Sequence, residues 1–153
     1  GERERVQTLN TSHDGYLARF GLTHERRIQL SPSGDRLEGE DLFWGEGAAV
    51  PSREAIVRFH LAPGIRASRA QGGRVVMLVL PNREAWQFSA GPGEAFVEDS
   101  IFLAVPDGMR RTEQIVLAFR PSETPSVRWR FERLARNFNP APPPPAEPAP
   151  DQA

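Results

Sequence analysis

Large apolar side chains alternate with polar ones along most of the chain. Val127, Trp129 and Phe131 are separated by single arginines, and the segment 57–61 repeats the same spacing. In a β-strand, successive side chains point to opposite faces, so this two-residue repeat gives one dry face and one wet face. The pattern therefore predicts half-buried strands over much of the sequence.

Short runs rich in Gly, Pro, Asn and Asp interrupt the alternating segments. They lie at 31–35, 63–64, 71–73, 81–83, 91–93 and 106–108. These residues favour turns, and no window of a dozen residues carries a helical stripe free of Gly and Pro. Short strands joined by turns every 8 to 12 residues or so are typical of antiparallel sandwiches. We therefore predict an all-β, antiparallel β-sandwich of about nine strands with very little helix.

The same alternation predicts which side chains form the core. The predicted buried set is Ile28, Leu30, Val57, Phe59, Leu61, Val76, Leu78, Trp86, Phe88, Ile115, Leu117, Val127, Trp129 and Phe131. The segment 75–80 is apolar on both faces and rich in β-branched valine, which suits an interior strand covered on both sides.

The length and the C-terminal composition predict one domain followed by a tail. A chain of 153 residues is long enough for a single domain with a sizeable core. From Asn139 onward, prolines and alanines dominate, and they offer few donors and little surface to bury. We expect a sandwich over residues 1–136 and a disordered, polyproline-leaning tail over 137–153. An alternative role for the tail is docking into an aromatic groove of a partner domain.

Composition excludes several classes of partner. All 19 basic residues are arginines and 20 acids balance them, for a net charge of −1, whereas nucleic-acid binders usually carry a basic excess. The longest apolar run, 75–80, is far shorter than the roughly 18 residues of a membrane-spanning helix. Cysteine is absent, which leaves the compartment open. Gly1 is preceded by no initiator Met, and the first residues do not form a signal peptide, so we expect a piece of a longer protein.

No metal or cofactor site is predicted. His13, His24 and His60 are too far apart in sequence for a readable zinc motif. The acidic stretch 38–41 is too short for a calcium loop, and we interpret it as a solvated strand edge. Phosphate-binding glycine loops and nucleophile-elbow serines are also absent.

A cluster near the N-terminus contains the residue types that β-elimination on uronates requires. Tyr16, Arg19, His24, Arg26 and Arg27 together offer an acid, a base and cations that neutralise a carboxylate. The alternation, however, places Arg26 and Arg27 on opposite strand faces, and Tyr16 follows an Asp-Gly turn signal. A structural role and a functional role both remain open for this cluster.

Several short sequence motifs follow one another along the chain. They are HDGYxxRFGxxHxRRxxL at 13–30, RLEGED at 36–41, RFHLAP at 58–63, and shorter motifs at 80–82, 86–88, 98–100 and 111–116. In this order, from about Ser12 to Phe131, they resemble the C-terminal β-domain of bacterial heparinase II/III-like proteins. That group contains polysaccharide lyases and their relatives.

The resemblance implies a partner domain but no local active site. In that group the catalytic cleft lies between an N-terminal helical toroid and the β-domain. The principal residues come from the toroid and from a His-Ala-Asp segment, and this chain contains no such segment. We therefore assign no catalytic or metal residue here. The implied partners are the toroid of the parent chain and an anionic polysaccharide, and the resemblance suggests a bacterial, periplasmic location.

Three functional hypotheses follow. The first is a groove-forming, supporting domain of a lyase that cleaves uronate glycans, inactive on its own. Its candidate substrate-groove residues are Tyr16, His24, Arg26, Arg58 and His60. The second is a stand-alone carbohydrate-binding or protein-interaction module, although the alternation turns Trp86 and Trp129 inward and leaves few aromatics for a sugar platform. The third is a compact enzyme built around Tyr16 and His24.

Overall fold

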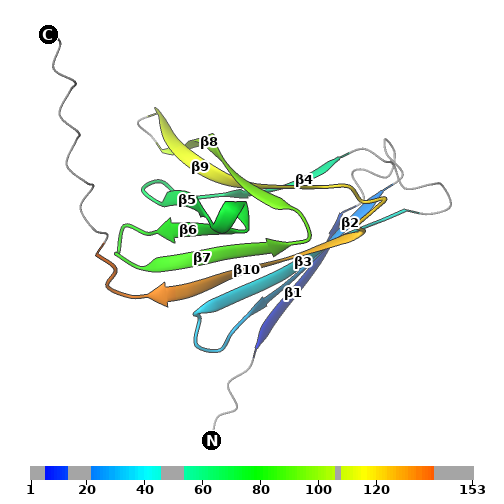
Figure 1. Ribbon diagram of the computed structural model, residues 1–153, viewed down its shortest axis with the longest axis horizontal. Helices are drawn as coiled ribbons and strands as arrows, with labels where there is room; N and C mark the ends of the chain where they lie inside the picture. Colours follow the sequence, from blue (N-terminus) through cyan, green and yellow to red (C-terminus); the bar gives the residue numbers. More distant parts are fainter. Residues whose placement is uncertain (1–5, 14–21, 46–53, 106–107, 140–153) are drawn as a thin grey trace, which may run out of the picture.

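The chain forms two antiparallel β-sheets. The computed structural model describes residues 6–13, 22–45, 54–105 and 108–139, and these hold ten strands (Figure 1). The strands are β1 Gln7–His13, β2 Thr23–Leu30, β3 Arg36–Trp44, β4 Ala55–His60, β5 Arg66–Ala70, β6 Val75–Val79, β7 Ala85–Gly91, β8 Glu94–Val105, β9 Gly108–Phe119 and β10 Ser126–Ala135. One 3-10 turn, η1 Gln71–Gly73, is the single helical element in the described residues.

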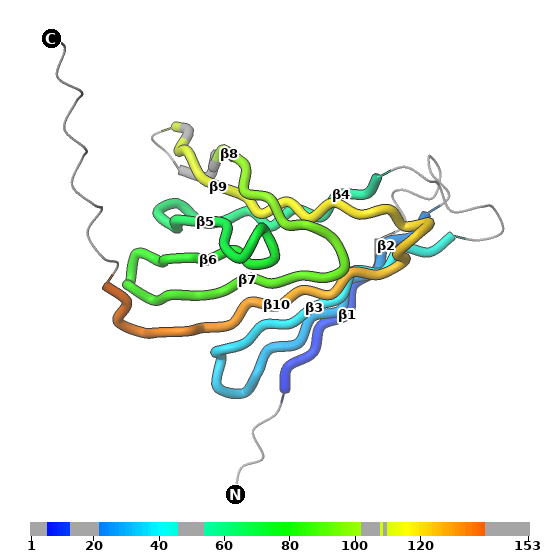
Figure 2. Tube along the Cα trace, viewed as in Figure 1, coloured from blue at the N-terminus to red at the C-terminus, as the bar shows by residue number. Residues whose placement is uncertain are grey.

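The last strand joins two sets of hairpin-linked strands into the larger sheet. That sheet has seven strands in the order β1-β2-β3-β10-β7-β6-β5, and the smaller has three in the order β4-β9-β8. Figure 2 shows the orange β10 running between the cyan β3 and the green β7. The predicted antiparallel sandwich is thus confirmed, with ten strands instead of about nine. The weakest sequence signal belongs to β1, which is an edge strand and leaves Leu9 56% exposed.

The core lies between the two sheets and is largely the predicted one. Most of the predicted set is buried, and Ile28, Leu30, Phe59, Trp86 and Phe131 are half-buried. Aromatic rings contribute much of the packing, because Phe59 of the small sheet meets several rings of the large sheet edge-on or tilted. Alternating inward residues of both sheets therefore fill the space, as expected for a sandwich.

Two expectations are refined by the observed arrangement. Strand β6 lies between β5 and β7, and Val75 is buried, but Met77 and Val79 are only half-buried on the outer face. At the C-terminal end, Phe138 N donates a hydrogen bond to Arg83 O at 2.8 Å, so backbone pairing with the sandwich continues two residues past 136. The predicted tail from Pro140 on lies outside the described residues. No helix in the described part is long and apolar enough to cross a membrane.

Candidate functional site

A buried carboxylate organises one end of the sandwich interior. Asp41 on β3 is 0% exposed and faces inward. His24 Nε2 lies 2.5 Å from its Oδ1, and Arg26 donates from Nε at 2.8 Å and from Nη2 at 3.2 Å. Trp129 Nε1 donates to Oδ2 at 2.7 Å. We call these four residues the Asp41 network.

Strand register brings the Asp41 network together. On β2, His24 and Arg26 share the inward face, and Arg26 is directly opposite Asp41 on β3. The His24 ring stacks on Phe43 at 4.6 Å between centroids. The guanidinium of Arg26 lies 5.7 Å from the Trp129 ring centroid, which is a favourable cation–π distance. Three strands, β2, β3 and β10, are thereby tied to one carboxylate.

The network keeps Asp41 ionised despite its burial. Burial by itself raises the pKa of Asp41, but hydrogen bonds from His24, Arg26 and Trp129 outweigh it and lower the pKa below its ordinary value. A buried charge is tolerable only when it is paired and hydrogen-bonded, and this one has four donors. Our interpretation of the stretch 38–41 as a solvated strand edge was therefore wrong at Asp41. This side chain lies on the inward face of β3, which the second sheet covers.

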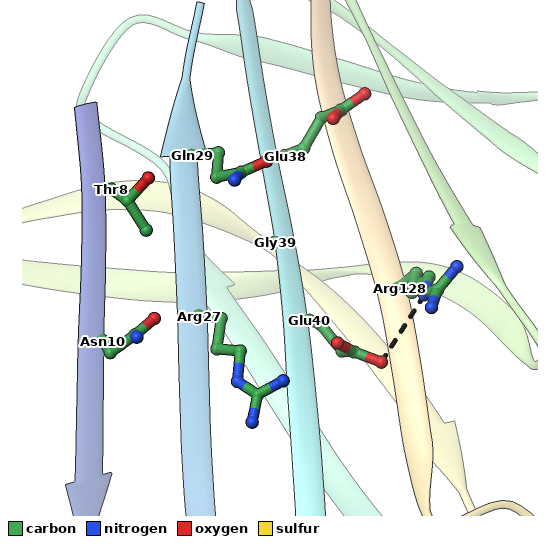
Figure 3. Close-up of a pocket in the computed structure, with 8 residues that line it drawn as sticks. All are labelled: Thr8, Asn10, Arg27, Gln29, Glu38, Gly39, Glu40 and Arg128. Atoms are coloured by element: carbon green, nitrogen blue, oxygen red, sulfur yellow. Dashed lines mark hydrogen bonds and ion pairs between the residues drawn. The ribbon is translucent and has the colours of Figure 1, made fainter. Parts of the chain in front are cut away.

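The opposite, outward face of the same strands carries an open hollow of about 530 Å³ (Figure 3). Its lining residues lie on β1, β2, β3 and β10, and all of them except Gly39 are polar or charged. The lining residues are Thr8, Asn10, Arg27, Gln29, Glu38, Gly39, Glu40 and Arg128. A second hollow of about 450 Å³ shares Glu38, Gly39 and Arg128 and continues toward β7. Together they form what we call the outer groove.

Charges of opposite sign alternate across the outer groove. Arg128 Nε lies 3.5 Å from Glu40 Oε1, and Arg130 Nη2 lies 2.6 Å from Glu38 Oε1. Arg27 pairs with Glu25 at 2.8 Å, and the pKa of Arg27 is raised by that hydrogen bond. The side chains of Arg27, Arg128 and Arg130 are 50%, 81% and 45% exposed. Their planar donors thus remain accessible to a ligand in the groove.

The outer groove and the Asp41 network meet at Gly39 and Trp129, which both line the second hollow. Gly39 is opposite Trp129 in the β3–β10 register, and any Cβ at this position would overlap the Trp129 ring. The indole therefore lies directly beneath the Gly39 backbone, and the same backbone forms part of the groove floor. The groove floor therefore touches the network at the Trp129 indole.

The candidate residues from the sequence are not gathered in one place. His24 and Arg26 lie in the Asp41 network, while Arg58 and His60 lie on the outer face of the small sheet. There Arg58 Nη1 is 3.2 Å from Glu98 Oε2, and His60 Nδ1 is 3.3 Å from Ser100 Oγ. Tyr16 lies outside the described residues. Within the described ranges, no group of three or more His, Asp or Glu is placed to hold a metal ion.

Sequence reasoning missed most of the outer groove. Its residues come from strands far apart in the chain, such as Asn10 on β1 and Arg128 on β10. The available signal was the set of polar, outward positions on each alternating strand, which includes Arg128 and Arg130. The order of the strands in the sheet decides which of these polar faces lie side by side. The alternation within a strand carries no information about that order.

The sequence motifs and the fold place this chain in a family. Residues 1–130 match the family described as heparinase II/III-like, C-terminal, and the chain belongs to it. FtsZ-localized protein C of Caulobacter vibrioides is 33% identical over 135 residues, which cover 82% of this chain and 23% of that protein. The chain thus spans about a quarter of the length of this curated relative.

Solved structures of lyases share the fold. The heparan sulfate lyase from Pedobacter heparinus superposes with a TM-score of 0.71 at 10% identity, over 90% of this chain and 21% of that one. A heparinase III structure superposes with a TM-score of 0.61 at 12% identity, over 91% of this chain and 21% of that one. Identities this low establish the common fold and nothing further.

Proposed function

We propose that this chain is the supporting, groove-forming β-domain of a heparinase II/III-like protein, and that its outer groove binds an anionic glycan. The observation that carries the proposal is the polar outer groove over β1, β2, β3 and β10. In this proposal the partner within the parent protein is an N-terminal helical toroid, which supplies the acid–base residues of a β-elimination.

The groove chemistry suits an acidic sugar chain. Arginine forks bind carboxylate and sulfate groups through paired N–H donors, and Arg27, Arg128 and Arg130 offer such forks. Thr8, Asn10 and Gln29 line the same surface with hydroxyl and amide groups, which match sugar hydroxyls. Glu38 and Glu40 leave one excess positive charge among the five charged side chains lining the two hollows, so binding should be weak and salt-sensitive.

The interior supports a role other than catalysis for this domain. His24 and Arg26 have the residue types needed for proton transfer and carboxylate neutralisation. Both are bound to Asp41, on the face opposite the outer groove. A group that already holds a buried carboxylate is poorly available to a substrate, so the pair acts in folding.

The test measures binding and turnover on the purified chain. Heparan sulfate and alginate should bind weakly, with affinity that falls as salt rises, and neither should give the absorbance of an unsaturated product. The double variant Arg27→Ala with Arg128→Ala should weaken binding by about fivefold or more, since each change removes a contact with a sulfate or carboxylate group. Arg136→Ala is the matched control because its charge lies outside the groove lining.

Two results would contradict the proposal. Equal loss in the control would show a nonspecific charge effect, and turnover by the isolated chain would favour the compact enzyme. In the full-length parent, Tyr16→Phe and His24→Ala should cause modest losses if the domain supports catalysis. A fall in turnover of about a hundredfold would instead indicate direct participation.

A second candidate function is a role at the bacterial division site. The 33% identity to FtsZ-localized protein C, well above the 10–12% to the lyase structures, favours it. A fluorescent fusion of the parent protein should then gather at the FtsZ ring in dividing cells. Uniform distribution, with FtsZ rings present in the same cells, would remove this candidate.

A further inference from the structure

The outer face of the three-stranded sheet carries a polar cluster that the proposed function does not use. Across β4, β9 and β8, one row of neighbours is His60, Gln114 and Glu98, and the next is Arg58, Val116 and Phe96. This face lies on the side of the sandwich opposite the outer groove, since the two sheets pack through their inner faces.

Gln114 in this cluster has an unsatisfied acceptor. Its side chain lies on the outward face, yet the residue is only 8% exposed. Its Nε2 donates to Glu98 Oε2 at 3.4 Å, while Oε1 is buried and has no hydrogen-bond partner within the described residues. A buried amide oxygen without a donor is costly, because it has given up its water without replacement. Such a group calls for a donor from outside the domain.

The groups around Gln114 are accessible and loosely held. The side chains of Arg58 and Glu98 are 42% and 51% exposed, and their contact is 3.2 Å. His60 reaches Ser100 at 3.3 Å, which is near the long limit for a hydrogen bond. Exposed pairs of this length exchange partners at little cost. His60 is opposite Gln114 in the β4–β9 register, so a ligand that displaces these side chains would approach the buried oxygen.

Apolar surface adjoins the polar row. Phe96 is 37% exposed and Ile56 is 47% exposed, both on the outward face. The guanidinium of Arg69 from β5 lies 4.7 Å from the Phe96 ring centroid and fixes that ring at the sheet edge. The face thus combines the exposed part of the Phe96 ring with planar donors and acceptors, a combination that suits a sugar ring.

Size and charge decide the class of ligand. Strands lie about 4.8 Å apart, so three strands present a face only about 10 Å across. The longest strands have 12 residues and are about 40 Å long, so the face covers at most about 400 Å². A stable protein interface needs about 800 Å² per partner, whereas this width fits one or two sugar rings. Arg58 and Glu98 cancel in charge within the polar row, and the guanidinium of Arg69 lies against the Phe96 ring, so the row itself offers no net charge to an acidic ligand.

We propose that the outer face of β4, β9 and β8 is a second binding site, specific for a neutral sugar unit. A sugar hydroxyl donates to Gln114 Oε1, Arg58 and Glu98 share the neighbouring hydroxyls as donor and acceptor, and the ring edge rests on Phe96. With the outer groove bound to an acidic chain, the sandwich would bind glycans on two faces, and the neutral unit would lie on the outer face of β4, β9 and β8. The inference does not depend on the proposed role of the outer groove.

The first test is a backbone amide NMR titration of the full chain with cellohexaose and chitohexaose. Either neutral oligosaccharide should shift amides of β4, β8 and β9 and leave those of β1 and β2 in place. Arg58→Ala should weaken the binding at least fivefold, whereas Arg128→Ala in the outer groove should leave it unchanged. Absence of shifts with both neutral probes, or shifts confined to the groove strands, would overturn the second site.

A second variant separates binding from folding. Gln114→Leu removes the unsatisfied amide oxygen at similar volume, so it should leave the melting temperature unchanged or raised. The same change should weaken the neutral oligosaccharide at least fivefold. A lowered melting temperature with unchanged binding would assign Gln114 to structure and overturn its role as a ligand contact.

Discussion

The Asp41 network and the outer groove both contain arginine–carboxylate pairs on the same strands, and the pairs differ in access to water. Strand β2 turns Arg26 inward and Arg27 outward, and β3 turns Asp41 inward and Glu40 outward. Inside, the carboxylate is 0% exposed and fully hydrogen-bonded. Outside, the pairs are screened by solvent and retain spare donors. The alternation of side chains along each strand thus places one set of ion pairs in the interior, where it ties the strands together. It places the other set on the surface, where it can bind a ligand.

The largest expected effect breaks the interior side of this comparison. Trp129→Ala removes a side chain that is 4% exposed and also takes one donor from Asp41, so it should cost about 3–5 kcal/mol in urea unfolding. Trp44→Ala is the matched control because Trp44 is 46% exposed, and it should cost less than about 1 kcal/mol. A loss for Trp129→Ala no larger than the control would reverse the assigned facing of β10.

Removing the buried charge should have the next largest effect. Asp41→Asn leaves the Arg26 guanidinium without its counter-ion in a partly buried site, which should cost about 3 kcal/mol. Glu40→Gln, one residue away on the wet face, should cost less than about 0.5 kcal/mol. Similar costs for the two variants would contradict the contrast between the faces.

Acid should expose the same contrast as a pH dependence. The pKa of Asp41 is lowered in the folded state, so the folded state favours its charged form. Its stabilisation is complete above the ordinary carboxyl pKa of about 3.9 and is lost as the pH falls through the lower folded value. Below about pH 4 the unfolding free energies of the wild type and Asp41→Asn should therefore converge. A constant difference from pH 7 to the acid transition would count against an ionised Asp41.

Changes on the wet face should be much smaller for stability. Arg128→Ala should alter the unfolding free energy by less than about 0.5 kcal/mol, because its pair with Glu40 is exposed. Its binding effect should shrink as salt rises. A stability loss above about 1 kcal/mol would show that the groove pairs also hold the sheet together.

The smallest expected effect is none at all. Truncation after Asn139 removes the proline-rich end and keeps the hydrogen bond of Phe138 to Arg83. The melting temperature should stay unchanged if the removed residues bury little surface. Unfolding of the truncated chain would place those residues in the packed domain.

The sequence was informative where a local pattern decides the structure. Alternation placed Trp129 and Val127 inward, and the low helix content followed from frequent turn residues. Alternation also separated Arg26 from Arg27, and both assignments are confirmed. These features depend on neighbours within one strand, which the sequence displays directly.

The sequence was uninformative where the partner is distant. Asp41 read as a solvated acid because its donors lie 15, 17 and 88 residues away. The outer groove required the order of β1, β2, β3 and β10, and the insertion of β10 beside β3 has no local signature. Charge and polarity could be read from the chain, but burial depended on which sheet covers which face.

Gly39 gives the molecule an internal optical reporter. Because no side chain stands between the groove floor and the Trp129 indole, occupancy of the groove changes the field around a buried fluorophore that is already hydrogen-bonded to Asp41. The chain has three tryptophans, and phenylalanine at Trp44 and Trp86 would leave Trp129 as the single emitter. The emission of that indole should then shift when a ligand occupies the groove, without any attached label.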